Sequence, residues 1–306
     1  MAILTLIPIL LFGGNMARVE AGNVRIAVLI SYQGAPFDET LEGFKQYLRK
    51  QGISADYDIY SLEASNEKVV QALLKVKKDK PDLIFTLGSL STEAAVKEIV
   101  DIPIIAGMIL RSDALRGTPN GTGVFLEFPA ETQLKWLQNF LPDTKTVGVI
   151  YNPTENRERI KSAVRIGQKM ALKIETREVH APEDLPNALN ELSKNIDVLW
   201  GVADNLVLTP QTARQILLFS FRNFIPLAGL SSSWVKAGAL YSLEGDYKDN
   251  GMQCGEMAFR VLQGTNVNSI TPMPQRKIIY SLNLNTAKHM KIKISEKLIR
   301  EAYLTY

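Results

Sequence analysis

The feature that most constrains this chain is a regular alternation of short apolar runs with longer amphipathic stretches. Residues 24–31 form a β-branched and almost wholly apolar run, as expected of a strand that is covered on both faces. After this run, apolar residues recur at the spacing of one helix face, at Phe37, Leu41, Phe44 and Leu48. Strands that alternate with crossover helices form parallel sheets, so the first unit already favours an α/β fold.

The same alternation occurs in two successive series. We expect further strands at residues 55–60, 82–87, 103–107 and 122–125, and a second series at residues 146–151, 173–179, 197–202, 225–228 and 239–243. The two series resemble each other in pattern, and 306 residues exceed the usual size of one compact core. The sequence therefore predicts two similar, doubly wound parallel-sheet lobes with a cleft between them.

The predicted lobes are discontinuous in sequence. The first comprises residues 24–127 together with about 245–270, and the second comprises residues 128–244 together with about 271–306. A crossing between the lobes is expected near residues 127–132.

The first residues resemble an export signal. Residues 2–12 are apolar, too few to span a bilayer, and small residues follow at Val19 and Ala21. We therefore expect residues 1–21 to be a signal peptide cleaved after Ala21, and the mature protein to lie in the periplasm. No Lys or Arg precedes the apolar run as a signal peptide usually requires, so a buried first strand or helix is the alternative. No cysteine follows the run to carry a lipid anchor.

Composition argues against several classes of function. The formal charge of +3, from 35 basic and 32 acidic residues, is too small for a nucleic-acid surface. The only cysteine, Cys254, is expected in the core, and His180 and His289 are expected at the surface, which leaves no thiolate cluster and little room for a zinc site. No nucleotide-binding glycine motif, P-loop or nucleophile elbow follows a strand. We therefore expect neither an enzyme nor a metal or other cofactor.

Ligands of open parallel sheets collect beyond the carboxyl ends of the strands, so the candidate site lies in those loops. Ser89, Ser91 and Thr92 precede a helix expected at residues 93–100, where hydroxyl groups and free N–H groups favour a carboxylate. Asp204, with Asn205, ends a strand of the second series and is a candidate partner for an ammonium group. The alternatives are that the hydroxyls only cap the helix and that Asp204 only forms a turn.

Other polar or aromatic side chains follow predicted strands and complete the candidate set. Tyr32 is suited to cover an apolar part of a ligand. The remaining candidates are Gln33, Asn152, Asn156, Ser231 and Ser232. A carboxylate site in one lobe and an ammonium site in the other predict that the ligand is an amino acid.

The whole mature chain resembles the transporter substrate-binding proteins of the tryptophan or aromatic-amino-acid type, which have the type I periplasmic fold. The matching pieces are Gly88-Ser89, residues 120–124, Tyr151-Asn152-Pro153, Asp204-Asn205, residues 238–240, Asp246-Tyr247 with Gly251, and residues 282–285 with Ala287-Lys288. The resemblance implies three strands that cross between the lobes, a ligand in the interlobe cleft, and delivery to the membrane permease of an ABC transporter. We expect a monomer that binds an aromatic or branched amino acid.

Two segments depart from the family pattern. Residues 108–113 lack the proline that often follows an aspartate after the fourth strand, and residues 154–157 replace smaller residues after Pro153. Two other functions stay open at this point. The same lobes could report a ligand to a membrane kinase or chemoreceptor, and an α/β enzyme in the cytoplasm would require that residues 1–21 be structural.

Overall fold

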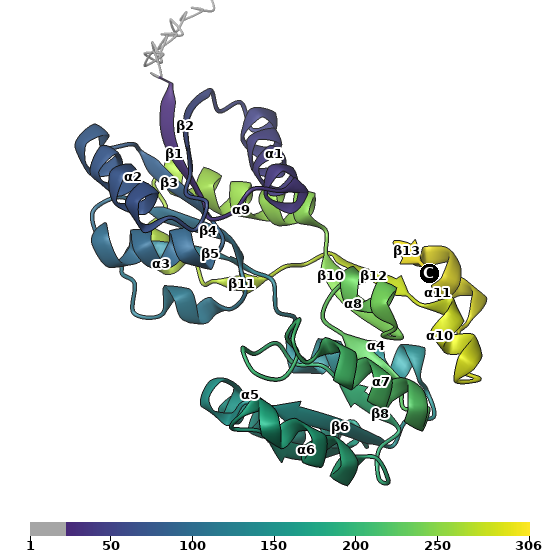
Figure 1. Cartoon of the computed structure of the whole chain (residues 1–306). Coiled ribbons are helices and arrows are strands. Elements are labelled where there is room, and N and C mark those ends of the chain that lie inside the picture. The colour runs from purple at the N-terminus through teal and green to yellow at the C-terminus, as the bar shows by residue number, and fades with distance from the viewer. Residues whose placement is uncertain (1–22) are drawn as a thin grey trace, which may run out of the picture.

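The computed structural model describes residues 23–306, so the expected signal peptide at residues 1–21 lies outside the described residues. The chain forms two α/β lobes that are joined by extended segments (Figure 1). Among residues 23–306, the helices are all too short or too polar to span a bilayer.

The first lobe is built on a parallel sheet in the order β11-β5-β4-β3-β1-β2. Its strands are β1 (Val24–Ile30), β2 (Ala55–Ser61), β3 (Leu83–Leu87), β4 (Ile104–Ile109), β5 (Gly121–Phe125) and β11 (Met273–Pro274). Its helices are α1 (Ala35–Lys50), α2 (Asn66–Asp79), α3 (Ser89–Glu98), α9 (Tyr247–Leu262) and the 3-10 turns η1 (Ser112–Leu115) and η3 (Val267–Ser269). Because α9 and β11 come from late in the sequence, this lobe is completed only when the chain returns to it.

The second lobe is built on a sheet in the order β13-β12-β10-β9-β8-β6-β7, in which only the β10–β12 pair is antiparallel. Its strands are β6 (Thr146–Tyr151), β7 (Lys173–Glu178), β8 (Val198–Trp200), β9 (Leu227–Gly229), β10 (Tyr241–Gly245), β12 (Ile278–Leu282) and β13 (Leu304–Thr305). Its helices are α4 (Ala130–Phe140), α5 (Pro153–Lys169), α6 (Leu185–Leu192), α7 (Ala213–Asn223), α8 (Ser232–Ala237), α10 (Leu284–His289), α11 (Glu296–Glu301) and the turn η2 (Pro182–Asp184).

The central strands of each sheet are buried on both faces, as the apolar runs predict. In β1, Ile26 and Val28 pack into the cluster that contains residues of α1 and α9, whereas Ala27 and Leu29 pack with α2 and α3. The same division occurs in β6, where Val149 and its neighbour Ile150 belong to different clusters. Successive side chains of a strand point to opposite faces, so a strand covered on both sides must be apolar throughout.

The chain crosses between the lobes three times, at residues 126–129, at Asp246 and at residues 275–277. Gln275 ties the crossings together. Its N–H donates to the Phe125 carbonyl at 3.0 Å, and its Nε2 donates to the Leu126 carbonyl at 2.6 Å. Its Oε1 lies 1.5 Å from the place that a Cβ at Gly245 would take, so a larger residue at position 245 would displace the Gln275 side chain. The joint between the lobes is therefore closely packed.

Two details differ from the sequence-based expectation. Helix α3 begins at Ser89 instead of residue 93, because Gly88 adopts a φ of 97° and turns the chain into the helix directly after β3. Strand β11 still pairs with β5 of the first sheet, so the third crossing falls after Pro274, a few residues beyond the expected boundary near 270.

Candidate ligand-binding cleft

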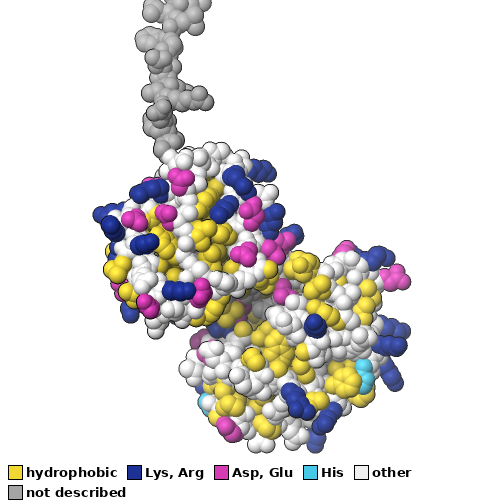
Figure 2. Space-filling view, turned by 45° about the horizontal axis from the view of Figure 1, so that its top comes forward, with side chains coloured by type: hydrophobic (Ala, Val, Ile, Leu, Met, Phe, Trp, Pro, Cys, Tyr) yellow, Lys and Arg dark blue, Asp and Glu magenta, His cyan; other side chains and the backbone are white. Residues whose placement is uncertain are grey.

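A cleft of about 630 Å³ lies between the lobes. The space-filling view shows this hollow between the upper and the lower lobe (Figure 2). Its walls come from the first crossing segment, from α4 and α5, and from the residues at the carboxyl ends of β8, β9 and β10. The volume is typical of a site for one small organic molecule.

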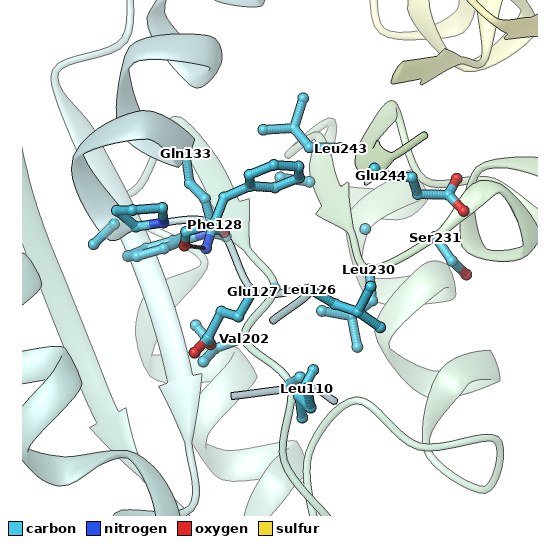
Figure 3. A pocket seen from close by; sticks show the side chains of 18 of the residues that line it. Leu110, Leu126, Glu127, Phe128, Gln133, Val202, Leu230, Ser231, Leu243 and Glu244 are labelled. Carbon is cyan, nitrogen blue, oxygen red and sulfur yellow. Dashed lines mark hydrogen bonds between the residues drawn. The ribbon is translucent and has the colours of Figure 1, made fainter. Parts of the chain in front are cut away.

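The wall of the cleft is largely apolar and aromatic. Phe128, Trp200 and Tyr241 line it, and the close-up shows Phe128 and Gln133 facing Leu243 and Leu230 across the pocket (Figure 3). Gln133 holds the Trp200 ring, because its Oε1 accepts from Trp200 Nε1 at 2.9 Å, and its Nε2 donates to the backbone carbonyl of Phe128 at 2.7 Å. Gln133 therefore joins the first crossing segment to the aromatic wall of the cleft.

Glu244 is the acidic group of the cleft that lacks a cationic partner. It lies beside Ser231 at the edge of the pocket, where β10 ends (Figure 3). One carboxylate oxygen accepts from the N–H of Ser232 at 2.6 Å and from Ser242 Oγ at 3.3 Å. Among residues 23–306, no Lys or Arg is within ion-pair distance of Glu244. Its negative charge is therefore available to a ligand.

The other charges at the cleft are paired with one another. Arg111, which follows β4, donates from Nε to Glu127 at 3.1 Å and from Nη2 to Asn156 of the second lobe at 3.0 Å. Arg159 of α5 forms ion pairs with Glu127 and with Asp113 of the first lobe. These contacts link the lobes at one side of the cleft and leave little free positive charge there.

Tyr247 also lines the cleft, at the start of α9. Burial raises the pKa of Tyr247 above its usual value, and the negative charge of Glu244 raises it further. The Tyr247 hydroxyl therefore stays protonated near neutral pH and is a hydrogen-bond donor at the edge of the cleft.

The hydroxyl groups predicted to bind a carboxylate in the first lobe are turned into the protein. Ser91 and Thr92 are fully buried. Ser91 Oγ donates to the Leu87 carbonyl at 3.0 Å, and Thr92 Oγ1 donates to the Gly88 carbonyl at 2.8 Å. Because α3 begins at Ser89, both hydroxyls lie inside its first turn and bond to the chain that precedes the helix.

Ser89, the first residue of α3, and the loop residues Tyr32 and Gln33 belong to the first lobe and lie outside the cleft wall. Ser89 is half-buried, whereas Tyr32 is 51% exposed and Gln33 is exposed. Gln33 Nε2 donates to Glu63 at 3.2 Å.

Asp204, the predicted ammonium partner, is engaged by the backbone. Its Oδ1 accepts from the N–H groups of Leu206 and Val207 at 2.9 and 2.6 Å, and its Oδ2 accepts from the N–H of Asn152 at 2.9 Å. Asp204 lies outside the cleft wall. The carboxylate forms the turn that the alternative interpretation described, and it also joins that turn to the start of α5.

The remaining polar candidates have different positions. The Asn152 side chain caps α5 by accepting from Thr154 N at 3.0 Å, and the N–H of Asn205 donates to Glu155 at 3.1 Å. Asn156 is buried and accepts from Arg111. Ser231 is the one candidate that lines the cleft, and Ser232 binds its acidic residue, Glu244.

The sequence-based reasoning missed Phe128, Gln133, Trp200, Tyr241 and Glu244. For Glu244 a signal was available, because it is the first charged residue after the apolar run at 239–243, at the same kind of strand end as Asp204. For Gln133 there was none, because its partner Trp200 lies 67 residues away in the sequence.

Within residues 23–306, no group of three or more His, Cys, Asp or Glu side chains is arranged to hold a metal ion. Cys254 is fully buried, which confirms its predicted place in the core, and burial raises the pKa of its thiol.

Comparisons with known proteins identify the family. A family model described as ABC transporter substrate binding protein matches residues 23–305. The chain is 27% identical over 289 residues to a tyrosine-binding protein of Clostridioides difficile (strain R20291), and the alignment covers 89% of this chain and 81% of that protein.

Two solved structures share the fold. The ligand-free, open structure of a substrate-binding protein with adhesive properties from Clostridium difficile superposes with a TM-score of 0.78 at 24% identity, covering 92% of this chain and 98% of that one. A domain from Streptococcus pneumonia in complex with L-Trp superposes with a TM-score of 0.66 at 20% identity, covering 93% and 100%. The predicted type I periplasmic fold is thereby confirmed, and the family consists of binding proteins rather than enzymes. Since the family model spans nearly the whole described chain, the protein belongs to the ABC transporter substrate-binding protein family.

Proposed function

We propose that this protein binds an aromatic amino acid in the interlobe cleft, outside the cytoplasm, and delivers it to the permease of an ABC importer. The observation that carries the proposal is the combination of an aromatic wall, Phe128, Trp200 and Tyr241, with Glu244, an acid that has no cationic partner among residues 23–306. Aromatic rings bury a large area against one another, and a free carboxylate at the edge of the same pocket suits an ammonium group.

The ligand carboxylate requires a donor that the second lobe does not supply, because the nearby arginines are paired with acids. The start of α3 is the suitable donor in the first lobe. Ser91 N donates to Ser31 Oγ at 3.0 Å, but the N–H groups of Ser89 and Leu90 have no acceptor within the helix. We therefore place the ring and the ammonium group on the second lobe, and the carboxylate on the first lobe after the lobes close by hinge motion.

The names of related proteins support the same class of ligand. One relative is called a tyrosine-binding protein, and one structural neighbour was solved in complex with L-Trp. Export and delivery to a permease are inferred from the family and from the apolar residues 2–12.

Calorimetric titration of the purified chain with single amino acids tests the proposal. L-Tyr, L-Trp and L-Phe should bind at least tenfold more tightly than L-Leu, L-Ala or L-Glu, because only a ring fills the aromatic wall. Equal or tighter binding of L-Leu or L-Glu would contradict the assignment of the aromatic wall to a ligand ring.

Substitution of Glu244 by Gln tests the ammonium contact. The amide keeps an acceptor oxygen for the N–H of Ser232 but loses the charge, so affinity for the best amino acid should fall about ten- to a hundredfold. In Glu244→Gln, the affinity for the analogue of this amino acid that lacks the carboxylate should fall by the same factor. The affinity for the analogue that lacks the ammonium group should not change. Glu183→Gln, an exposed acid of the same lobe, is the matched control. If all three ligands weaken equally, Glu244 shapes the pocket and does not bind the ammonium group.

A further inference from the structure

The surface of the second lobe around the ends of α7, α8 and α10 is formed by two stretches of sequence without acidic residues. Residues 205–243 contain no Asp or Glu, and a second acid-free stretch, residues 257–295, begins in the first lobe and enters this lobe at residue 278. The fold brings these two stretches together. The rings of Phe221 and His289 stack at 3.6 Å, Thr286 Oγ1 donates to the Gly238 carbonyl at 3.1 Å, and Asn283 Nδ2 donates to the Val235 carbonyl at 2.7 Å.

Exposed cations and exposed rings share this surface. We call it the basic aromatic face and define it by Phe221, Arg222, Phe224, Lys236, Lys288 and Lys291, all of which are exposed. Among residues 23–306, none of these cations has an acidic partner within ion-pair distance. In the space-filling view, Lys and Arg side chains gather along the right and lower edges of the lower lobe, with few acids among them (Figure 2).

Two of these residues occupy strained backbone positions. Phe224 ends α7 with a φ of 54°, and Lys291 follows α10 with a φ of 59°, in the left-handed region where glycine is the usual residue. Phe224 is nevertheless 56% exposed, so burial of its ring does not compensate for the strain. His289 stacks on this ring at 4.9 Å, so the left-handed turn and the stacking hold an exposed ring in a defined position at the surface.

A purely structural explanation accounts for only part of this face. Arg222, Lys236 and Lys288 lie in the last turns of their helices, where a cation interacts favourably with the helix dipole. The interaction with the helix dipole explains the positions of these cations. It does not explain why phenyl rings are exposed beside them or why the two stretches of sequence contain no acidic residue. The rings also have a defined arrangement, because His289 stacks on Phe221 at 3.6 Å and on Phe224 at 4.9 Å.

We propose that the basic aromatic face docks on the surface of a bilayer that contains anionic phospholipids. Exposed phenyl rings surrounded by lysines and arginines, without acids, are suited to the headgroup region, where rings enter the interface and cations meet lipid phosphates. Charge complementarity favours this occupant, because every unpaired charge of the face is positive. The contact would hold the second lobe near the membrane, independently of what the cleft binds.

Vesicle sedimentation of the purified protein tests the proposal. At low salt, the protein should partition onto vesicles of phosphatidylcholine with 30% phosphatidylglycerol and not onto pure phosphatidylcholine. Binding should weaken strongly at 0.5 M salt, because salt screens exposed charges. Equal partition onto the neutral vesicles, or none onto the anionic ones, would overturn the proposal.

Charge variants locate the contact. Lys236→Glu and Lys288→Glu should each lower the partition coefficient about tenfold or more. Lys78→Glu is the matched control, since Lys78 is an exposed cation in the last turn of α2 in the first lobe. It should leave partition within about twofold of the wild type. A loss for Lys78→Glu as large as for Lys236→Glu would show that net charge, and not this face, governs binding.

The ring variant separates docking from folding. In Phe224→Gly, glycine accepts the left-handed position, so the thermal midpoint should stay or rise, while partition falls several-fold. Binding of amino acids in the cleft should be unchanged in every one of these variants, which keeps this test separate from that of the cleft. If the protein sediments only with native membranes that contain proteins, and never with protein-free anionic vesicles, the partner is an acidic protein and the lipid proposal is wrong.

Discussion

The two lobes have the same layered architecture, but they differ in what their strand ends present to the cleft. In the first lobe, the hydroxyls of Ser91 and Thr92 turn inward and bond to the chain that precedes α3. In the second lobe, the strand ends present Trp200 and Glu244 to the cleft. A polar residue at a strand end is therefore a candidate ligand contact only when its side chain also lines the cleft.

The lobes also differ in how they are assembled. Helix α9 packs on α1 so closely that a Cβ at Gly251 would lie 1.9 Å from the Thr40 carbonyl oxygen. A Cβ at Gly43 would lie 2.0 Å from the Lys248 carbonyl oxygen. The first lobe thus depends on a close contact between segments about 200 residues apart in the sequence, a contact for which small residues are required.

The largest predicted effect breaks that contact. Gly251→Ala should lower the free energy of unfolding of the first lobe by about 3 kcal/mol or more, because the obstructing atoms are backbone and cannot move aside. All three tryptophans, Trp136, Trp200 and Trp234, lie in the second lobe. Circular dichroism should therefore show loss of structure at a lower urea concentration than tryptophan fluorescence does.

Gly148→Ala in the second lobe is the matched control. A Cβ there would meet only the side chain of Ile196, which can shift, so the cost should be about 1 kcal/mol. Coincident transitions in Gly251→Ala by both probes would show that the lobes unfold as one unit and that the contrast in assembly has no energetic consequence.

A second prediction, of intermediate size, contrasts two acids at the strand ends of the second lobe. Asp204→Asn should cost about 2 kcal/mol of stability, since the amide has only one acceptor oxygen and cannot satisfy all three N–H groups that bond to the carboxylate. It should change ligand affinity by less than about threefold. Glu244→Gln, in contrast, should lower ligand affinity and leave stability nearly unchanged. Urea unfolding and calorimetry on both variants give the comparison. A loss of affinity in Asp204→Asn that is as large as in Glu244→Gln would return Asp204 to the ligand site.

The fold was predictable from the sequence because its signals are local. A strand buried on both faces must be apolar along its length, and a helix that covers it must be apolar at the helical spacing, as residues 24–31 and Phe44 illustrate. The resemblance to the family added the three crossings. Strand ends shifted by only a few residues between expectation and structure.

The site was harder to predict because it depends on which partners are already bound. The sequence shows that Ser91 and Asp204 follow strands, but not that a carbonyl or three N–H groups already engage them. The pairing of Gln133 with Trp200 and of Arg111 with Asn156 likewise joins distant segments. Residue type and position relative to a strand locate the correct edge of the sheet, whereas contacts between distant segments decide which residues there line the cleft.

The smallest predicted effect concerns the second crossing, where the chain leaves the second lobe and begins α9. Asp246 caps α9 by accepting from the N–H of Asp249 at 2.9 Å, and it pairs with Lys277 of the third crossing. Desolvation by burial tends to raise the pKa of Asp246. The bond from Lys277 and the N–H of Asp249 lower it more, so the pKa lies below its usual value. A carboxylate whose pKa is lowered by folding stabilises the protein above its unfolded pKa, and this contribution disappears as the pH falls through the folded pKa.

Asp246→Asn keeps the cap acceptor and removes only the charge, so it should cost about 0.5 to 1 kcal/mol near pH 7, because the ion pair is partly exposed to solvent. The difference from the wild type should shrink as the pH is lowered from 5 toward 3, where the wild-type carboxyl becomes protonated. Since the cap belongs to the first lobe, circular dichroism should register the loss before tryptophan fluorescence does. Urea unfolding at several pH values, with both probes, measures this. A destabilisation that is the same at pH 3 and pH 7 would mean that the oxygen geometry of the cap, and not the charge at the crossing, stabilises the first lobe.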